Sequence, residues 1–170
     1  MLRLVQFFWG LCTLKNAPQD LPASQALLGM TLLAYFLSGT VVSVLQWSVP
    51  KAVLAAALDT LLFTILCYIL LWARLLTNRF VQTMTALAGS TTLLALIAAP
   101  LVFWQRQIGA LESGVVTFPT LLLLAWAGWN VAVVGNIIRH ALSTVFALGI
   151  ALAALYTYIT LQLIRIFFPQ

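Results

Sequence analysis

The feature that most constrains this chain is a series of five long apolar stretches separated by short polar connections. They run approximately over residues 24–47, 51–72, 80–104, 118–138 and 141–168. The hydrocarbon core of a bilayer accommodates about 20 apolar residues per helix. Because lipid offers no water to the backbone, each stretch must satisfy its own hydrogen bonds as a helix. We therefore predict an all-α polytopic membrane bundle, with five transmembrane helices in one domain over residues 24–168.

The composition agrees with a lipid environment. Hydrophobic residues make up 64% of the 170 residues, the mean hydropathy is +1.10, and the chain has only eight Lys or Arg and three Asp or Glu. A membrane β-barrel is excluded because its strands alternate apolar and polar residues, whereas blocks such as 93–99 and 121–124 are unbroken. The net charge of +5 comes from single basic residues spread over the connections. It predicts contact with lipid headgroups and no nucleic-acid binding.

Residues 1–15 predict an amphipathic helix in the membrane interface. On a helical projection, Arg3, Gln6, Gly10 and Thr13 form a narrow stripe, and apolar side chains cover the remaining circumference. Such a helix can lie in the interface plane with its apolar side toward the lipid. The alternative is a frayed hydrophobic start of the chain.

Three helix starts can be located from single residues. Ser24 stands where it can cap the first span, because its side-chain oxygen can accept a bond from a free N–H of the first turn. Pro50 and Pro119 lie near the starts of the second and fourth spans, where the missing N–H of a proline would be unbonded anyway.

The intramembrane polar candidates are Asp59, Asn130 and Asn136. A carboxylate at membrane depth is costly, so Asp59 is expected to face a partner or a wet cavity. One interpretation is a proton or cation relay, or a contact to a substrate. The other is a structural clasp to Asn130, Asn136 or a threonine of a neighbouring helix, and interhelical hydrogen bonding also explains the two asparagines.

Small residues at four-residue spacing predict close helix contacts within the bundle or between copies of the chain. The residues that we expect at such contacts are Ala56 and Thr60 in the second span, Gly128 and Ala132 in the fourth, and Gly149 and Ala153 in the fifth.

No pattern for catalysis, a metal or a cofactor is found. His140 is the single histidine, Glu112 lies alone in a connection, and Cys12 and Cys67 belong to different segments. Metal sites usually need three or four protein ligands, and no phosphate-binding glycine loop is present. We expect no cofactor and no enzymatic activity.

Counting Lys and Arg predicts the orientation. The side of the N-terminus carries Arg3, Lys15, Arg74, Arg79 and Arg139, and the other side carries Lys51, Arg106 and Arg165. Because cytoplasmic connections are enriched in Lys and Arg, we expect a cytoplasmic N-terminus and an exterior C-terminus in the inner membrane.

The second half of the chain resembles the Yip1-like family of small polytopic membrane proteins. The resemblance covers about residues 77–164 and rests on Asn78-Arg79-Phe80-Val81-Gln82, followed by Ala86, Gly89, Pro100, Trp129 and the joint Arg139-His140-Ala141-Leu142-Ser143. It implies five spans and an accessory or organising role, with no active-site residues to carry over.

Three functions remain open at this point. The first is a non-enzymatic membrane subunit that acts as a scaffold, assembly or accessory factor, bound to another integral membrane protein or to copies of itself. The second is a small transport component, either a permease subunit or a proton-coupled carrier, that uses Asp59. The third is an anchor for a redox enzyme, in which His140 would ligate a haem between chains.

Overall fold

The computed structural model describes residues 2–108 and 117–167, with side chains from Leu4 onward. The α-helices of this part are α1 (Leu2–Cys12), α2 (Gln25–Val44), α3 (Val49–Ala73), α4 (Phe80–Gln107), α6 (Phe118–Leu142) and α7 (Phe146–Phe167), with 3-10 turns at Pro18–Asp20 and Thr77–Arg79. Helices α2, α3, α4, α6 and α7 are long and apolar enough to cross a membrane. For the described residues, the predicted all-helical bundle with five spanning helices is confirmed. Glu112 and Phe168 lie outside the described residues.

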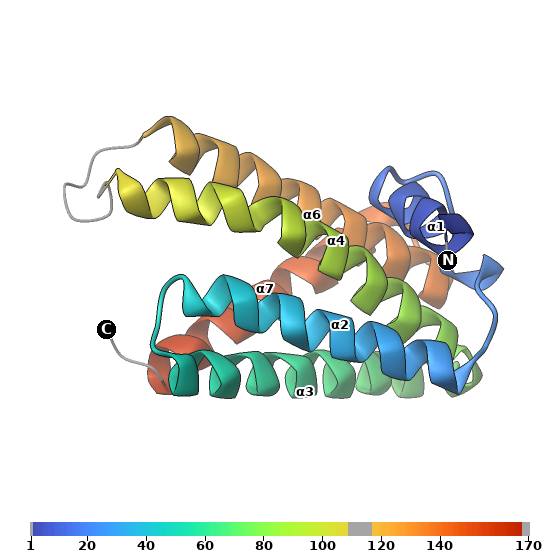
Figure 1. The fold of residues 1–170 in the computed structure, drawn as a ribbon. Helices are drawn as coiled ribbons and strands as arrows, with labels where there is room; N and C mark the ends of the chain where they lie inside the picture. The colour runs from blue at the N-terminus through green and yellow to red at the C-terminus, as the bar shows by residue number, and fades with distance from the viewer. Residues whose placement is uncertain (1, 109–116, 168–170) are drawn as a thin grey trace.

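The five long helices alternate in direction and form two groups (Figure 1). At the end of the bundle that carries α1, here called the α1 side, all five helices lie close together. Toward the opposite side, α4 and α6 diverge from the group of α2, α3 and α7 (Figure 1).

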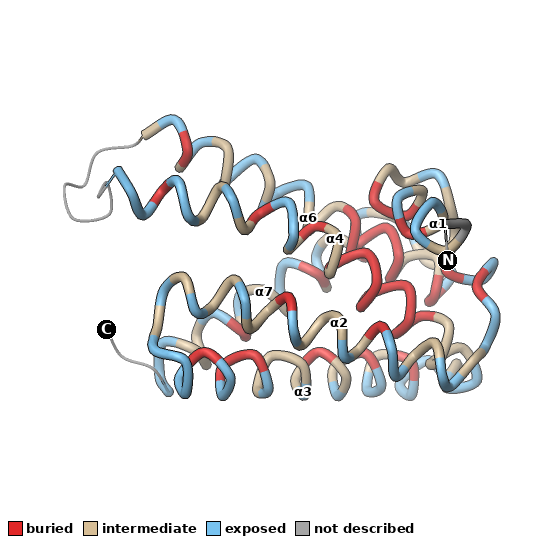
Figure 2. Tube along the Cα trace, in the orientation of Figure 1, coloured by how far each residue is buried: buried red, intermediate tan, exposed pale blue. Residues whose placement is uncertain are grey.

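The buried core lies in the α1 half of the bundle (Figure 2). Every residue of α4 from Thr83 to Thr91 is buried, because α1, α2 and α6 all pack around this segment. The hydroxyl groups of Ser90 and Thr91 donate to the carbonyls of Ala86 and Leu87, at 2.8 and 2.6 Å. These bonds within one helix let polar residues lie in an apolar core.

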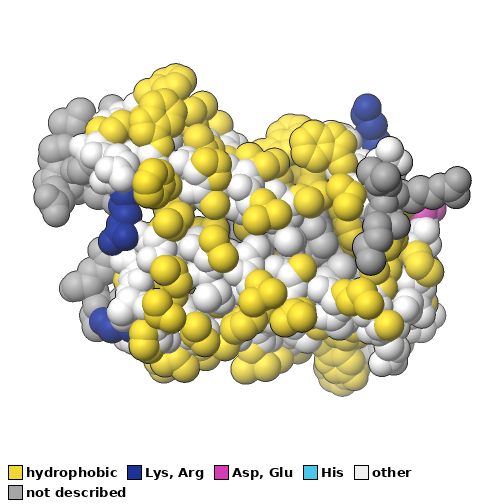
Figure 3. Space-filling view, viewed as in Figure 1, with side chains coloured by type: hydrophobic (Ala, Val, Ile, Leu, Met, Phe, Trp, Pro, Cys, Tyr) yellow, Lys and Arg dark blue, Asp and Glu magenta, His cyan; other side chains and the backbone are white. Residues whose placement is uncertain are grey.

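The outer surface is largely apolar. In Figure 3, hydrophobic side chains cover the middle of the visible face, and Lys and Arg lie toward its two ends. Exposed Leu33, Leu61 and Leu124 are each more than half accessible. This distribution suits helices surrounded by hydrocarbon, with charges at the depth of the headgroups.

Helix α1 packs on the protein through part of its apolar face. Leu11 and Cys12 are buried, and the Phe8 ring lies where a side chain at Gly89 of α4 would be. Val5 and Trp9 remain 55% exposed. The predicted helix is present, but only part of its apolar surface packs on α4, and the rest is exposed on the surface of the protein. Burial raises the pKa of the Cys12 thiol to about 11.

Three connections on the α1 side have a residue in the left-handed conformation one or two positions after the end of the preceding helix. Leu14, Leu75 and Ser143 have φ values of 61°, 56° and 53°. After α6, the N–H of Thr144 donates to the Arg139 carbonyl at 2.9 Å, and the N–H of Ser143 donates to the His140 carbonyl at 3.3 Å. This bonding pattern is a Schellman motif, which satisfies the last free carbonyls of a helix.

The boundary between the last two spans differs from the prediction. We expected a span over 118–138 and the next one from residue 141, whereas α6 continues to Leu142 and α7 begins at Phe146. The polar Arg139 and His140 do not break a helix, and the chain turns only where Ser143 becomes left-handed. The other spans also differ from the predicted ends by up to three residues.

Helices α6 and α7 cross at two glycines. A Cβ atom at Gly135 would lie 2.8 Å from the backbone nitrogen of Ile150, and one at Gly149 would meet the backbone of Gly135. The absence of side chains therefore allows the two backbones to touch.

Candidate functional site

Asp59 lies between two tyrosine hydroxyl groups. Tyr35 of α2 donates to Oδ2 of Asp59, and Tyr156 of α7 donates to Oδ1 at 2.8 Å. All three residues lie about ten residues, or roughly 15 Å, from the starts of their helices. This position is near the middle of a hydrocarbon core that is about 30 Å thick. Both oxygens of the carboxyl group therefore have a donor at membrane depth.

An aromatic stack holds the two tyrosines in place. Phe63 follows Asp59 by one helical turn, so both side chains lie on the same face of α3. The Phe63 ring lies 5.1 Å from the Tyr35 ring and 4.9 Å from the Tyr156 ring, measured between centroids. Phe63 is only 4% exposed. The stack joins α2, α3 and α7 and directs both hydroxyl groups to the same carboxyl.

A cavity of about 380 Å³ opens beside Asp59, between the two helix groups. Along α2 its lining extends from Tyr35 to Ser43, and along α7 from Tyr156 to Ile164, which is about 12 Å on each helix. Both directions lead toward the side of the bundle where the groups diverge (Figure 1). Asp59 and Phe63 therefore lie at the inner end of the cavity.

The lining combines polar and apolar groups. Besides Tyr35 and Tyr156, its uncharged polar side chains are Ser38, Ser43, Thr91, Asn130, Thr157 and Thr160, and the Trp126 indole adds an aromatic surface. The Trp126 N–H donates to the Leu94 carbonyl of α4 at 3.0 Å. No hydrogen bond joins the Asn130 amide to the described part of the chain. This amide is therefore available to a bound molecule.

Asp59 has no cationic neighbour in the cavity. Among residues 2–108 and 117–167, the side chains that line the cavity include no Lys, Arg or His. In the same part of the chain, no group of three or more His, Cys, Asp or Glu could hold a metal ion. The site thus offers one carboxyl group, several hydroxyl groups, an amide and aromatic rings, which can bind a proton or an organic cation.

The structure separates the predicted polar residues. Asp59 and Asn130 line the same cavity, on α3 and α6. Asn136 is buried elsewhere on α6, and its Nδ2 group has no hydrogen-bond partner among the described residues. Neither asparagine bonds to Asp59, so the expected clasp to an amide or a threonine is replaced by two tyrosines.

The predicted packing residues also have different surroundings. Ala56 is buried, with its Cβ atom 3.7 Å from where a Cβ would stand on Gly39 of α2. Gly149 and Ala153 are buried in α7. Thr60 and Ala132 are half-buried, and the Thr60 hydroxyl donates to the Ala56 carbonyl of its own helix. A Cβ atom added at Gly128 would meet no atom within 4 Å, so this part of α6 is open.

Tyr35, Tyr156 and Gly135 are the important residues that the sequence analysis missed. Tyrosine usually prefers the ends of membrane helices, so its position in the middle of two spans was a usable signal. Gly135 lies seven residues after Gly128 and three after Ala132 in the same helix, and therefore on the same face of α6 as these two predicted packing residues. A search for small residues at spacings of three and seven, as well as four, could have found it.

Comparisons of the chain with family models, with curated proteins and with solved structures find no match.

Proposed function

We propose that this chain is a non-enzymatic transport component, a permease subunit or proton-coupled carrier, that binds a small organic cation beside Asp59. The observation that carries the proposal is the position of Asp59 at the inner end of a cavity of about 380 Å³. Ligand sites commonly have volumes of about 300–1,000 Å³ and a few polar groups in a mostly apolar lining. The described cavity meets both conditions.

The chemistry of the carboxyl group supports coupling to protons. An isolated carboxylate in a medium of low polarity is stabilised by a proton or by a cation, because its desolvation is otherwise uncompensated. The two tyrosine hydroxyl groups donate to its two oxygens and hold the carboxyl in one orientation. Exchange of a proton for a solute cation at Asp59 would link the movement of one to that of the other.

A second role, as a scaffold or accessory subunit, is favoured by the open face of α6. A Cβ atom at Gly128 would meet no atom within 4 Å, and Leu121 and Leu124 are more than half exposed. Small residues flanked by large apolar ones suit contact with a second membrane helix. Such a helix could belong to another integral membrane protein or to a copy of this chain, in keeping with the Yip1-like resemblance.

The distribution of basic residues supports a location in the inner membrane with the N-terminus in the cytoplasm. Among the described side chains, Lys15, Arg74, Arg79 and Arg139 lie on the α1 side, against Lys51, Arg106 and Arg165 on the other. In this orientation, the cavity would open toward the exterior.

The test measures proton movement in proteoliposomes that contain a pH-sensitive dye. Butyltrimethylammonium is added outside while a potassium diffusion potential is imposed. We expect a change of internal pH that depends on the cation for the native chain, and its loss for Asp59→Asn. The matched control is Asp20→Asn, which removes the same charge from the 3-10 turn at Pro18–Asp20. Equal signals from the native chain and Asp59→Asn would refute the proposal.

A further inference from the structure

Asn130 lies across the Asp59 cavity from the carboxyl group. Asp59 belongs to α3 in one helix group and Asn130 to α6 in the other, and both side chains line the cavity between the groups. Asp59 lies about 21 Å from the end of α3 on the α1 side, and Asn130 lies about 18 Å from the end of α6 on that side. The two polar side chains therefore lie at a similar depth in the membrane.

Asn130 stands in the middle of the α6 face that lines the cavity. Trp126 and Val134, one helical turn before and after it, line the same space. The Trp126 N–H already donates to a backbone carbonyl of α4, and the Val134 side chain has no polar group. Of these three side chains, the Asn130 amide is therefore the one that can exchange hydrogen bonds with a solute.

Three hydroxyl groups of the lining are already engaged. Ser38, Thr91 and Thr157 donate to carbonyls of their own helices at 3.0, 2.6 and 2.9 Å. The Thr160 hydroxyl oxygen is buried. The Asn130 amide has a donor group and an acceptor oxygen, and neither is bonded to the described part of the chain. It can therefore pair with a polar group of the solute.

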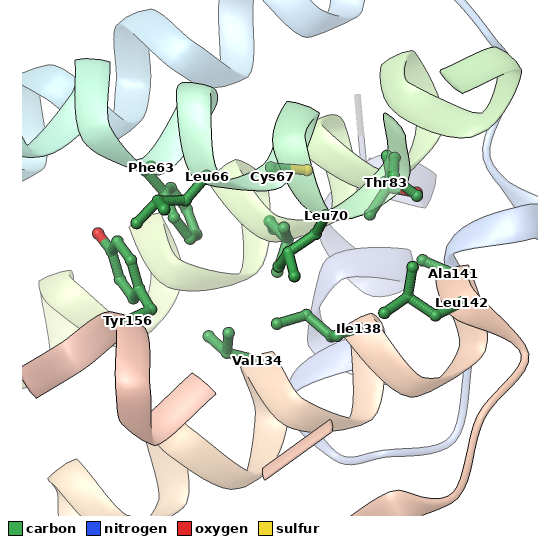
Figure 4. Close-up of a pocket in the computed structure, with 12 residues that line it drawn as sticks. Phe63, Leu66, Cys67, Leu70, Thr83, Val134, Ile138, Ala141, Leu142 and Tyr156 are labelled. Carbon is green, nitrogen blue, oxygen red and sulfur yellow. The ribbon is translucent and has the colours of Figure 1, made fainter. Parts of the chain in front are cut away.

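The end of the cavity next to Asp59 offers no such pairing. Phe63, Val134 and Tyr156 line this end and also line a second cavity of about 30 Å³ on the α1 side, so the two spaces have a common wall. Figure 4 shows the smaller space between α3 and α6, with the Tyr156 hydroxyl pointing away from it. Its lining atoms are apolar and give a hydroxyl group no partner. A polar group on a solute held at Asp59 is therefore best placed toward Asn130.

We propose that Asp59 and Asn130 together select an organic cation that carries a neutral hydrogen-bonding group, such as a terminal hydroxyl, on a short chain. The carboxyl binds the ammonium group, and the amide binds the hydroxyl group on the opposite wall. An anionic group in place of the hydroxyl would be unpaired, because no Lys, Arg or His of the described part of the chain lines the cavity. This inference rests on the proposed function, because it names the class of solute that the Asp59 cavity accepts.

The test measures proton movement in proteoliposomes with three matched pairs of trimethylammonium compounds. In each pair, a terminal hydroxyl group replaces the terminal methyl group of an alkyl chain. The pairs are propyl against hydroxyethyl, butyl against hydroxypropyl, and pentyl against hydroxybutyl. The hydroxyl preference of a protein is the concentration of the alkyl compound that gives half of the maximal signal, divided by that of its hydroxyl counterpart.

Removal of the amide should lower the hydroxyl preference. For at least one pair, Asn130→Leu should lower it about 2- to 12-fold relative to the native chain, which is the contribution of one neutral hydrogen bond. Differences in membrane partitioning cancel, because both proteins are measured with the same compounds. Asn130→Ala repeats the comparison without the bulk of leucine. The matched control is Asn136→Leu, the same change at a buried position of α6 outside the cavity, which should keep the native preference.

Two outcomes would overturn the inference and leave the proposed function intact. The first is a signal that depends on Asp59 but shows the same hydroxyl preference in the native chain and in both Asn130 variants, for all three pairs. The second is an equal fall of the preference in Asn130→Leu and Asn136→Leu, which would show a general effect of changing α6. Equal proton signals from the native chain and Asp59→Asn would instead refute the proposed function, and the inference with it.

Discussion

Replacing Gly135 by alanine should destabilise the bundle, because the new methyl group has no space at the crossing of α6 and α7. The added Cβ atom would lie 2.8 Å from the nitrogen and 2.9 Å from the Cα atom of Ile150. Favourable contacts of such atoms are about 3.5–4.0 Å long. Both neighbours belong to the backbone, so relief requires α7 to move away by about 0.6–1.2 Å.

The size of the effect follows from the loss of contacts. A radial gap of about 0.5–1 Å forfeits a quarter to a half of the dispersion energy of each contact, and overpacked sites are commonly destabilised by about 1–3 kcal/mol. Alanine also gains about 1 kcal/mol over glycine in helix propensity. Gly128→Ala on the same helix shares this gain and meets no atom within 4 Å. The difference between the two variants thus isolates the overpacking, at about 1–3 kcal/mol.

Thermal unfolding in detergent, followed by circular dichroism, measures this difference. For a chain of this size, 1 kcal/mol corresponds to about 2–4 °C in the melting temperature. Gly135→Ala should therefore melt at least about 2 °C below Gly128→Ala. If Gly135→Ala melts at the same temperature as Gly128→Ala or above it, the close contact of the two helices is refuted.

Three further changes test other parts of the structure. Leu75→Gly should stabilise the chain by about 1–2 kcal/mol in the same melting assay, because glycine avoids the strain of the left-handed conformation. Leu75 has a φ of 56° and is 88% exposed, so its side chain has few contacts to lose. An unchanged melting temperature would contradict this prediction. Tyr156→Phe should lower the free energy of unfolding by about 0.6–1.7 kcal/mol, because it removes a hydrogen-bond donor to Asp59 while keeping the ring stack. The control Tyr158→Phe, at a position that is 60% exposed, should leave the stability unchanged. Equal losses of stability in the two variants would argue against the hydrogen bond from Tyr156 to Asp59. The pKa of the Cys12 thiol is about 11 in the folded chain against an ordinary value of 9.0, so the docking of α1 should be intact below pH 9 and weaken as the pH rises toward 11. The melting temperature of Cys12→Ser should fall less over that range than that of the native chain. An identical fall would show that ionisation of the thiol is not the cause.

Local signals in the chain predict the helix starts well. The Ser24 hydroxyl accepts a bond from the Leu27 N–H at 3.3 Å and caps α2, as expected. Pro50 and Pro119 both lie in the first turn of a helix. These features depend on neighbouring residues only, so the sequence contains the information that is needed. The end of α6 is different, because a left-handed Ser143 is not marked by glycine.

The candidate site could be predicted only in part. Asp59 is identifiable because a carboxyl group at membrane depth is unusual. Its partners are not, since which residues of α2 and α7 meet α3 depends on the rotation and tilt of each helix. The same dependence places Asn130 in the cavity and Asn136 outside it.

The class of fold, the number of spanning helices and the residue whose charge requires an explanation can all be predicted from the amino-acid sequence. These follow from the length of apolar stretches and from the cost of a charge in lipid, and both are local quantities. Tertiary structure alone decided that Tyr35 and Tyr156 hold Asp59, that α6 and α7 touch at Gly135, and that two cavities have a common wall. The physical reason is that lipid is as apolar as a protein core. A membrane helix therefore carries little amphipathic pattern to show which of its faces meets another helix and which meets the bilayer.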